Sequence, residues 1–80
     1  MNTYEKLHTV ATNINREGMG MNLALIRRAI SYHLGDGVIV AETGPDWPQT
    51  KETKYFAQVN DSYAFGSTPM RAISNLLQKQ

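Results

Sequence analysis

The residues of this chain that could bind a metal ion or transfer protons are few and widely spaced. There are two histidines, His8 and His33, and no cysteine. A zinc site takes three or four ligands, at least two of them close in sequence, and neither histidine has a second histidine three or four positions away. We therefore expect both to be surface or boundary residues of helices, and we predict no metal site and no cofactor.

The seven carboxylates add little that favours catalysis. Asp36, Asp46 and Asp61 occupy predicted turns, where aspartate side chains hydrogen-bond to the local backbone. Glu42 follows a predicted strand, and general acid–base catalysis would require a second carboxylate converging on it. No nucleophile elbow, phosphate-binding loop or dinucleotide-binding glycine pattern is present. The sequence therefore predicts a protein that binds a partner and is not an enzyme.

Five residues are of types that favour contact with another protein. Trp47 lies in a predicted loop, and tryptophan is enriched at the energetic centres of interfaces. Met19 and Met21 flank a glycine, where they would form an adaptable contact surface if exposed and fill gaps in the core if buried. Arg27 and Arg28 lie on the polar side of a predicted helix. These five are the predicted partner contacts, with folding of Trp47 back onto the core as the alternative for that residue.

A second set of residues predicts nucleic-acid binding as the alternative function. Its members are basic: Arg27, Arg28, Lys51, Lys54 and Arg71. The formal net charge of the chain is only +1, so the overall field attracts nucleic acid weakly and a local patch would have to provide the affinity. This alternative predicts binding that weakens steeply with salt.

Hydrophobic periodicity predicts the elements that position these residues. Apolar residues recur at helical spacing over residues 3–17, 22–34 and 69–79, with Asn22 and either Ser67 or Thr68 as N-caps and Pro69 in the first turn. Short β-branched or aromatic runs at 38–41, 55–59 and 63–65 predict strands, and residues 51–54 are expected to begin the second strand. The strands are joined by short turns, which favours an antiparallel sheet.

The resulting prediction is a single α+β domain spanning residues 1–80. It has two N-terminal helices, a small antiparallel three-stranded sheet and one C-terminal helix. An apolar fraction of 41% and a charged fraction of 19% are typical of globular chains. The absence of cysteine, of a signal peptide and of a membrane-length apolar run favours the cytoplasm. Because so short a domain buries little surface, a homodimer remains an open alternative.

The C-terminal half resembles the small bacteriophage ABA-sandwich proteins. The resemblance rests on the strand Tyr55-Phe56-Ala57-Gln58-Val59, on the helix start Pro69-Met70-Arg71-Ala72, and on the strand 36–42 that ends in glutamate. It implies a phage or prophage accessory protein, located in the cytoplasm of a bacterial host, with no catalytic residues to transfer. Our hypothesis is that the protein binds a host protein or defence complex and inhibits it, in the manner of an anti-CRISPR or another anti-defence protein.

The order of helix, three strands and helix is also similar to the double-stranded RNA-binding domain. That family grips phosphates with a lysine cluster at the start of its last helix. The matching positions here read Ser67-Thr68-Pro69-Met70-Arg71, with one basic residue. This resemblance therefore implies a nucleic-acid-binding module only as the alternative.

Overall fold

The computed structural model describes residues 2–20, 22–46 and 50–79, and its elements follow the predicted order. In this part of the chain the helices and strands are α1 (Thr3–Arg16), α2 (Leu23–Leu34), β1 (Val38–Glu42), β2 (Tyr55–Val59), β3 (Ser62–Gly66) and α3 (Pro69–Gln78). Two short 3-10 turns, η1 (Gly35–Gly37) and η2 (Lys51–Thr53), precede β1 and β2. The predicted α+β fold, with a three-stranded antiparallel sheet, is confirmed.

Each α-helix begins at a polar side chain that caps it. The side-chain oxygen of the residue before the helix accepts a hydrogen bond from a backbone N–H three residues later, which satisfies one of the unpaired donors of the first turn. The pairs are Glu5 with Asn2 (2.9 Å), Leu25 with Asn22 (3.1 Å) and Arg71 with Thr68 (3.0 Å). Thr68, not Ser67, is thus the cap of α3.

The expectation that residues 51–54 begin the second strand is wrong. Lys51–Thr53 form η2 instead, with Lys54 just after it, because two threonines bond to each other locally. The backbone N–H of Thr50 donates to Oγ1 of Thr53 (3.1 Å), and the two hydroxyls lie 2.9 Å apart. Such local side-chain bonds give the backbone an alternative to a sheet ladder, and β2 starts only at Tyr55.

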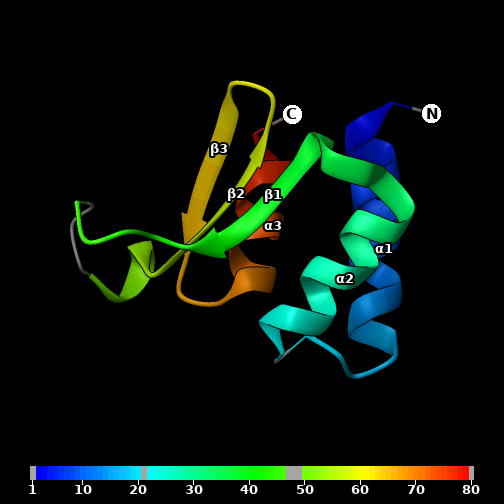
Figure 1. Ribbon diagram of the computed structural model, residues 1–80, viewed down its shortest axis with the longest axis horizontal. Helices are drawn as coiled ribbons and strands as arrows, with labels where there is room; N and C mark the ends of the chain where they lie inside the picture. Colours follow the sequence, from blue (N-terminus) through cyan, green and yellow to red (C-terminus); the bar gives the residue numbers. More distant parts are fainter. Residues whose placement is uncertain (1, 21, 47–49, 80) are drawn as a thin grey trace.

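The sheet has the order β1-β2-β3, so β2 is central and the other two strands form its edges (Figure 1). Val40 of β1 stands opposite Ala57 of β2, which stands opposite Ala64 of β3. The hairpin between β2 and β3 turns at Asn60, whose φ of 54° lies in the left-handed region that asparagine tolerates.

The helices cover one face of this sheet and enclose the core. α3 packs across all three strands, α2 packs beside β1, and α1 packs on α2 and α3 (Figure 1). Gly66, at the end of β3, is required by this packing, because a Cβ there would collide with the backbone of Arg71 and Ala72 in α3. The most deeply buried side chains come from both layers: Leu7, Ile14, Ile26, Val59, Ile73 and Leu76.

The opposite face of the sheet is more exposed and carries aromatic side chains. Ile39 is 48% exposed and Tyr63 is 43% exposed, whereas Phe56 and Phe65 are half-buried. The alternation of inward and outward residues follows from the two-residue period of a strand. The Ile39 side chain, at the outer edge of this face, also borders the site described next.

Candidate functional site

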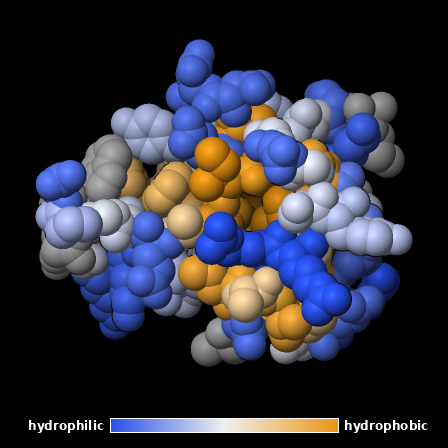
Figure 2. All heavy atoms as spheres, viewed as in Figure 1, coloured by the Kyte–Doolittle hydropathy of each residue, from blue (hydrophilic) through white to orange (hydrophobic). Residues whose placement is uncertain are grey.

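A groove with a volume of about 620 Å³ lies between α2 and β1. One wall is a single face of α2, because Ala24, Arg27, Arg28 and Ser31 are three or four residues apart. The other wall is β1, and η1 closes one end. Figure 2 shows this region as a hollow with apolar walls crossed by hydrophilic side chains. We call it the α2–β1 groove.

The backbone of β1 is one wall of this groove, and the hydrogen-bond pattern tells which of its groups face outward. The N–H of Thr43 donates to the carbonyl of Lys54 (3.0 Å). Bonded and non-bonded pairs alternate along an antiparallel ladder, so Ala41 and Ile39 bond to β2. Val40 and Glu42 instead direct their N–H and C=O away from the sheet. Within the described residues, no hydrogen bond is made to these outward groups, which we call the β1 edge.

The outward backbone carbonyls of β3, at the other edge of the sheet, do have hydrogen-bond partners. They accept hydrogen bonds from two side chains of the C-terminal segment. Nδ2 of Asn75 donates to the carbonyl of Phe65 (2.7 Å), and Nζ of Lys79 donates to that of Tyr63 (2.5 Å). Unpaired strand edges tend to recruit further chains unless they are covered or blocked. Of the two edges, only that of β3 is covered in this way by described side chains.

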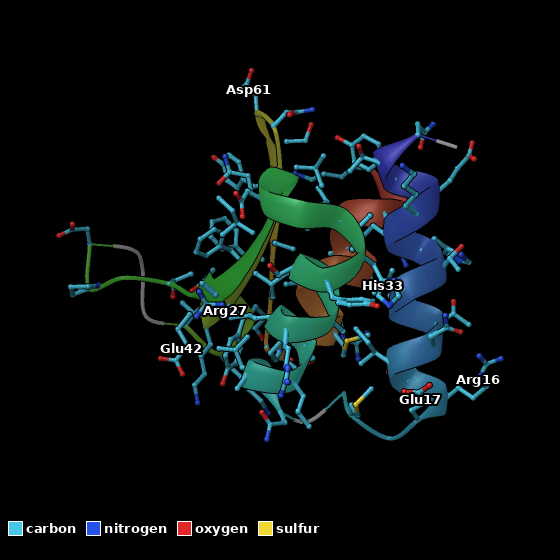
Figure 3. The ribbon with its side chains drawn as sticks, turned by 45° about the vertical axis from the view of Figure 1, so that its right-hand side comes forward. Arg16, Glu17, Arg27, His33, Glu42 and Asp61 are labelled. Atoms are coloured by element: carbon cyan, nitrogen blue, oxygen red, sulfur yellow. The ribbon has the colours of Figure 1, made fainter. Side chains whose placement is uncertain are left out.

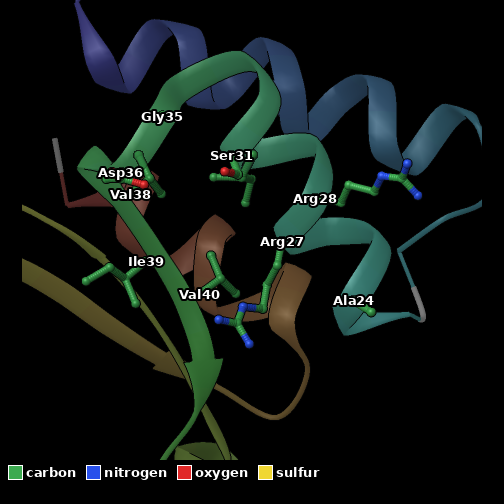
Figure 4. Close-up of a pocket in the computed structure, with 10 residues that line it drawn as sticks. Ala24, Arg27, Arg28, Ser31, Gly35, Asp36, Val38, Ile39 and Val40 are labelled. Carbon is green, nitrogen blue, oxygen red and sulfur yellow. The ribbon is translucent and has the colours of Figure 1, made fainter.

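Arg27 gives the groove its positive charge. Its side chain extends from α2 across the groove toward Val40, whereas that of Arg28 points away from β1 (Figure 4). In the described part of the chain neither guanidinium forms a hydrogen bond or an ion pair. Asp36 lies at the η1 end, so the charges along the groove run from positive beside Val40 to negative beside Val38.

The predicted partner contacts are only partly brought together. Arg27 and Arg28 both lie on the α2 side of the groove and are exposed. Met19 is partly buried and packs against the core, so it fills space between helices. Trp47 and Met21 lie outside the described residues.

The basic residues predicted for nucleic-acid binding are distributed over three elements. Arg27 and Arg28 lie beside β1, Lys51 lies in η2 with Lys54 just after it, and Arg71 lies in the first turn of α3. η2 packs near β3, at the other side of the sheet from α2. Lys54 is also placed against an aromatic ring, with Nζ 5.8 Å from the ring centre of Tyr55.

A second, smaller hollow of about 300 Å³ lies on the aromatic face of the sheet. It is lined by Phe56, Gln58, Tyr63 and Phe65. The rings of Tyr63 and Phe65 meet edge to face with centres 5.6 Å apart, and Nζ of Lys79 lies 5.6 Å from the ring centre of Tyr63. An ammonium group beside a ring gains from the negative charge of its π-face.

Residues that could carry out other chemistry lie elsewhere. His8 and His33 are both exposed, and the ring of His33 contacts that of Tyr32. Figure 3 places His33 among the helices, and Glu42 and Asp61 at opposite ends of the sheet. Among the described residues no three of His, Asp and Glu are close enough to hold a metal ion. None of the described helices is long and apolar enough to cross a membrane.

Sequence reasoning missed the most distinctive part of the site, the β1 edge. The run 38–41 was recognisable as a strand, but no local signal marks it as an edge strand, since the order of strands depends on tertiary packing. The helical spacing of Ala24, Arg27 and Ser31 was the one available signal for the facing wall. No family model, curated protein or solved structure matches the chain.

Proposed function

We propose that this chain is a small phage or prophage accessory protein that acts by binding a protein of its bacterial host. The contact surface is the α2–β1 groove. The observation that carries the proposal is the exposed guanidinium of Arg27, which extends across this groove and forms no hydrogen bond or ion pair within the described residues.

The groove has the properties of a recognition site. Its volume lies in the range of ligand sites, which are mainly apolar with a few placed polar groups. Ile39, which is 48% exposed, provides apolar surface at the rim, and Arg27 provides orientation and charge. Arginine is enriched in protein interfaces, and it forms planar paired hydrogen bonds to carboxylates.

The residues of this groove support catalysis less well than they support binding of a partner. Catalysis by proton transfer needs an acid and a base that converge on one point. The lining holds a single carboxylate, that of Asp36, and no histidine. Glu42, the carboxylate that the sequence singled out as a candidate for a catalytic pair, is exposed. We therefore infer that the protein is not an enzyme.

The biological setting belongs to the proposal as well. The resemblance of segments 36–42 and 55–59 and of the helix from Pro69 to phage ABA-sandwich proteins supports a phage or prophage origin. A chain of 80 residues without a catalytic set can act on a larger host complex by covering one of its surfaces. We infer that the protein acts in the host cytoplasm as an inhibitor of a host protein or defence complex, including the anti-CRISPR type.

Affinity capture from a bacterial lysate tests the proposal. Tagged wild-type protein and the variant Arg27→Ala/Arg28→Ala are compared, each with and without nuclease. We expect one host protein to be retained in stoichiometric amount by the wild type after nuclease treatment, and to be lost from the variant. Equal retention by both proteins would remove the groove from the contact surface.

Nucleic-acid binding is the second candidate, and one observation favours it. The hollow among Phe56, Tyr63 and Phe65 has the ammonium of Lys79 at its side. Bases stack on aromatic side chains, and neighbouring cations bind the phosphates. Recovery of nucleic acid alone, lost after nuclease and at moderate salt, would support this candidate over protein binding.

A further inference from the structure

We propose that the exposed side of α2, from the α2–β1 groove outward, binds an amphipathic helix of the partner protein that carries acidic side chains beside an apolar stripe. The inference rests on the proposed function and names the kind of segment that this surface recognises. The apolar stripe of the partner helix packs on Leu25 and Tyr32, and its carboxylates face Arg27 and Arg28.

The exposed side of α2 carries an apolar pair that does not belong to the core. Leu25 is 39% exposed and Tyr32 is 84% exposed. They are seven residues apart, which is two turns of the helix, so both point the same way and lie about 10 Å apart along its axis. A single exposed apolar residue is ordinary, but this pair has the spacing of the anchors in a contact between two helices.

Two unpaired cations lie beside the apolar pair. Figure 4 shows the side chain of Arg27 directed toward β1 and that of Arg28 directed away from it. Neither guanidinium forms a hydrogen bond or an ion pair within the described residues, and the sequence of α2 contains no acidic residue. The nearest carboxylate of the groove, that of Asp36, lies beyond the end of α2, in η1. The surface therefore complements a partner that brings its own carboxylates.

β1 offers the partner no open backbone, which favours a helix over an extended segment. Val38 and Val40 are buried, and α2 packs beside them. A helix satisfies its own backbone hydrogen bonds and meets a surface through side chains alone. The 12 residues of α2 provide about 18 Å of length, enough to align with roughly three turns of a second helix.

Short side chains determine where the partner helix lies. At about 100° per residue, the exposed positions of α2 run outward from the groove in the order Arg27, Ser31, Ala24, Arg28 and Tyr32. Ala24 and Ser31 thus lie between the two arginines, and the distance between packed helices depends on the size of the side chains at the contact. A helix seated over them has one flank facing the guanidinium groups and the other on the apolar pair.

A second copy of this chain fits the surface less well. If two α2 helices packed against each other, the arginines of one copy would face those of the other, and like charges in an interface are unfavourable. Since α2 contains no acidic residue, neither copy could neutralise them. A helix of opposite charge avoids this repulsion.

Titration of the ¹⁵N-labelled protein with a synthetic helical peptide, followed by NMR, tests the inference. The probe is a capped, alanine-rich peptide of eighteen residues, with leucine at its sixth and thirteenth positions and glutamate at its ninth and tenth. The leucines repeat the spacing of Leu25 and Tyr32, and the two glutamates lie on opposite flanks, so one of them faces the arginines whichever way the peptide runs. We expect saturable shifts centred on the amides of Leu25, Arg28 and Tyr32, with a Kd of roughly 0.1–1 mM.

Single variants of the protein show which side chains bind the peptide. Tyr32→Ala should weaken binding about fivefold, because tyrosine is a frequent energetic centre of interfaces. Arg28→Ala should weaken it about threefold, as for an exposed charge pair. The matched control is Arg16→Ala, which lies on the opposite side of the helices from Arg27 (Figure 3) and should change binding less than about 1.5-fold. All three side chains are exposed, so each variant should fold as the wild type does.

Two altered peptides separate the helical fit from charge attraction alone. Replacing both glutamates by lysine should weaken binding about tenfold, because attraction becomes repulsion. Replacing the alanine before the glutamates by proline keeps the charge and breaks the helix, and should also cost about tenfold. Equal binding of the proline peptide, equal binding by Tyr32→Ala, shifts centred on the aromatic face, or no saturable shift up to about 5 mM peptide would each overturn the inference. So would binding of phosphatidylglycerol vesicles or of nucleic acid through these side chains without binding of the peptide.

The outcome is distinguishable from a failure of the proposed function. If a host protein is captured by the wild type and lost from Arg27→Ala/Arg28→Ala while the helical peptide does not bind, the arginines contact the partner by another geometry and only the helical mode falls. If capture is unaffected by the double variant, the groove itself is not the contact surface.

Discussion

Replacing Gly66 by alanine tests the junction that holds α3 on the sheet. A Cβ at this position would lie 2.7 Å from the carbonyl carbon of Arg71 and closer still to the backbone of Ala72. Both neighbours are main-chain atoms of a helix, so no flexible side chain can move aside. Overpacking of this kind typically costs about 1–3 kcal/mol. In a domain of this size, about 2 kcal/mol corresponds to a fall in Tm of roughly 8–16 °C.

Thermal unfolding followed by circular dichroism measures this effect, and Gly44→Ala is the matched control. A Cβ at Gly44 would meet no atom within 4 Å, so its Tm should stay within about 3 °C of the wild type, as expected for a surface change. A Gly66→Ala variant that melts with the wild type would refute the packing argument.

Three further predictions concern stability and exposure. Thr68→Ala removes the cap on the N–H of Arg71 and should cost about 1 kcal/mol in chemical denaturation, whereas Thr68→Ser should restore most of it. Ile26→Ala empties a fully buried site and should cost about 2–5 kcal/mol, or prevent folding at 37 °C. In hydrogen exchange by NMR, the outward amide of Val40 should exchange at least about tenfold faster than the ladder-bonded amide of Ala41; equal rates would contradict the edge assignment.

Most of the fold was predictable because its signals are local. The stripe of Leu7, Val10, Ala11 and Ile14 has one consistent period, and these side chains are all buried in the structure. Caps and glycines then mark where the helices end. The error at residues 51–54 has an equally local cause. The hydroxyls of Thr50 and Thr53 form hydrogen bonds that compete with strand pairing, and the strand propensity of the segment gives no sign of these bonds.

The site was less predictable because its parts come from different levels of structure. Arg27 was identifiable from its type and its place on a helix. Its position across the groove from Val40 was not, because it depends on which strand lies at the edge of the sheet and on where α2 packs. Met19 illustrates the opposite case: its type suited a contact surface, but the packing of α1 against its neighbours leaves it partly buried against the core.

The two edges of the sheet differ in how the protein covers their outward backbone groups. Both edge strands are five residues long, so length alone does not protect either. On β3, Asn75 and Lys79 lie one helical turn apart and occupy two successive outward carbonyls. On β1, the facing helix presents Ala24 and Ser31, which are too short to reach across in this way, and Arg27, whose guanidinium donates to no described carbonyl. The same fold therefore covers its two edges differently: side chains of the C-terminal segment bond to the outward carbonyls of β3, whereas α2 packs beside β1 and Val38 and Val40 are buried there.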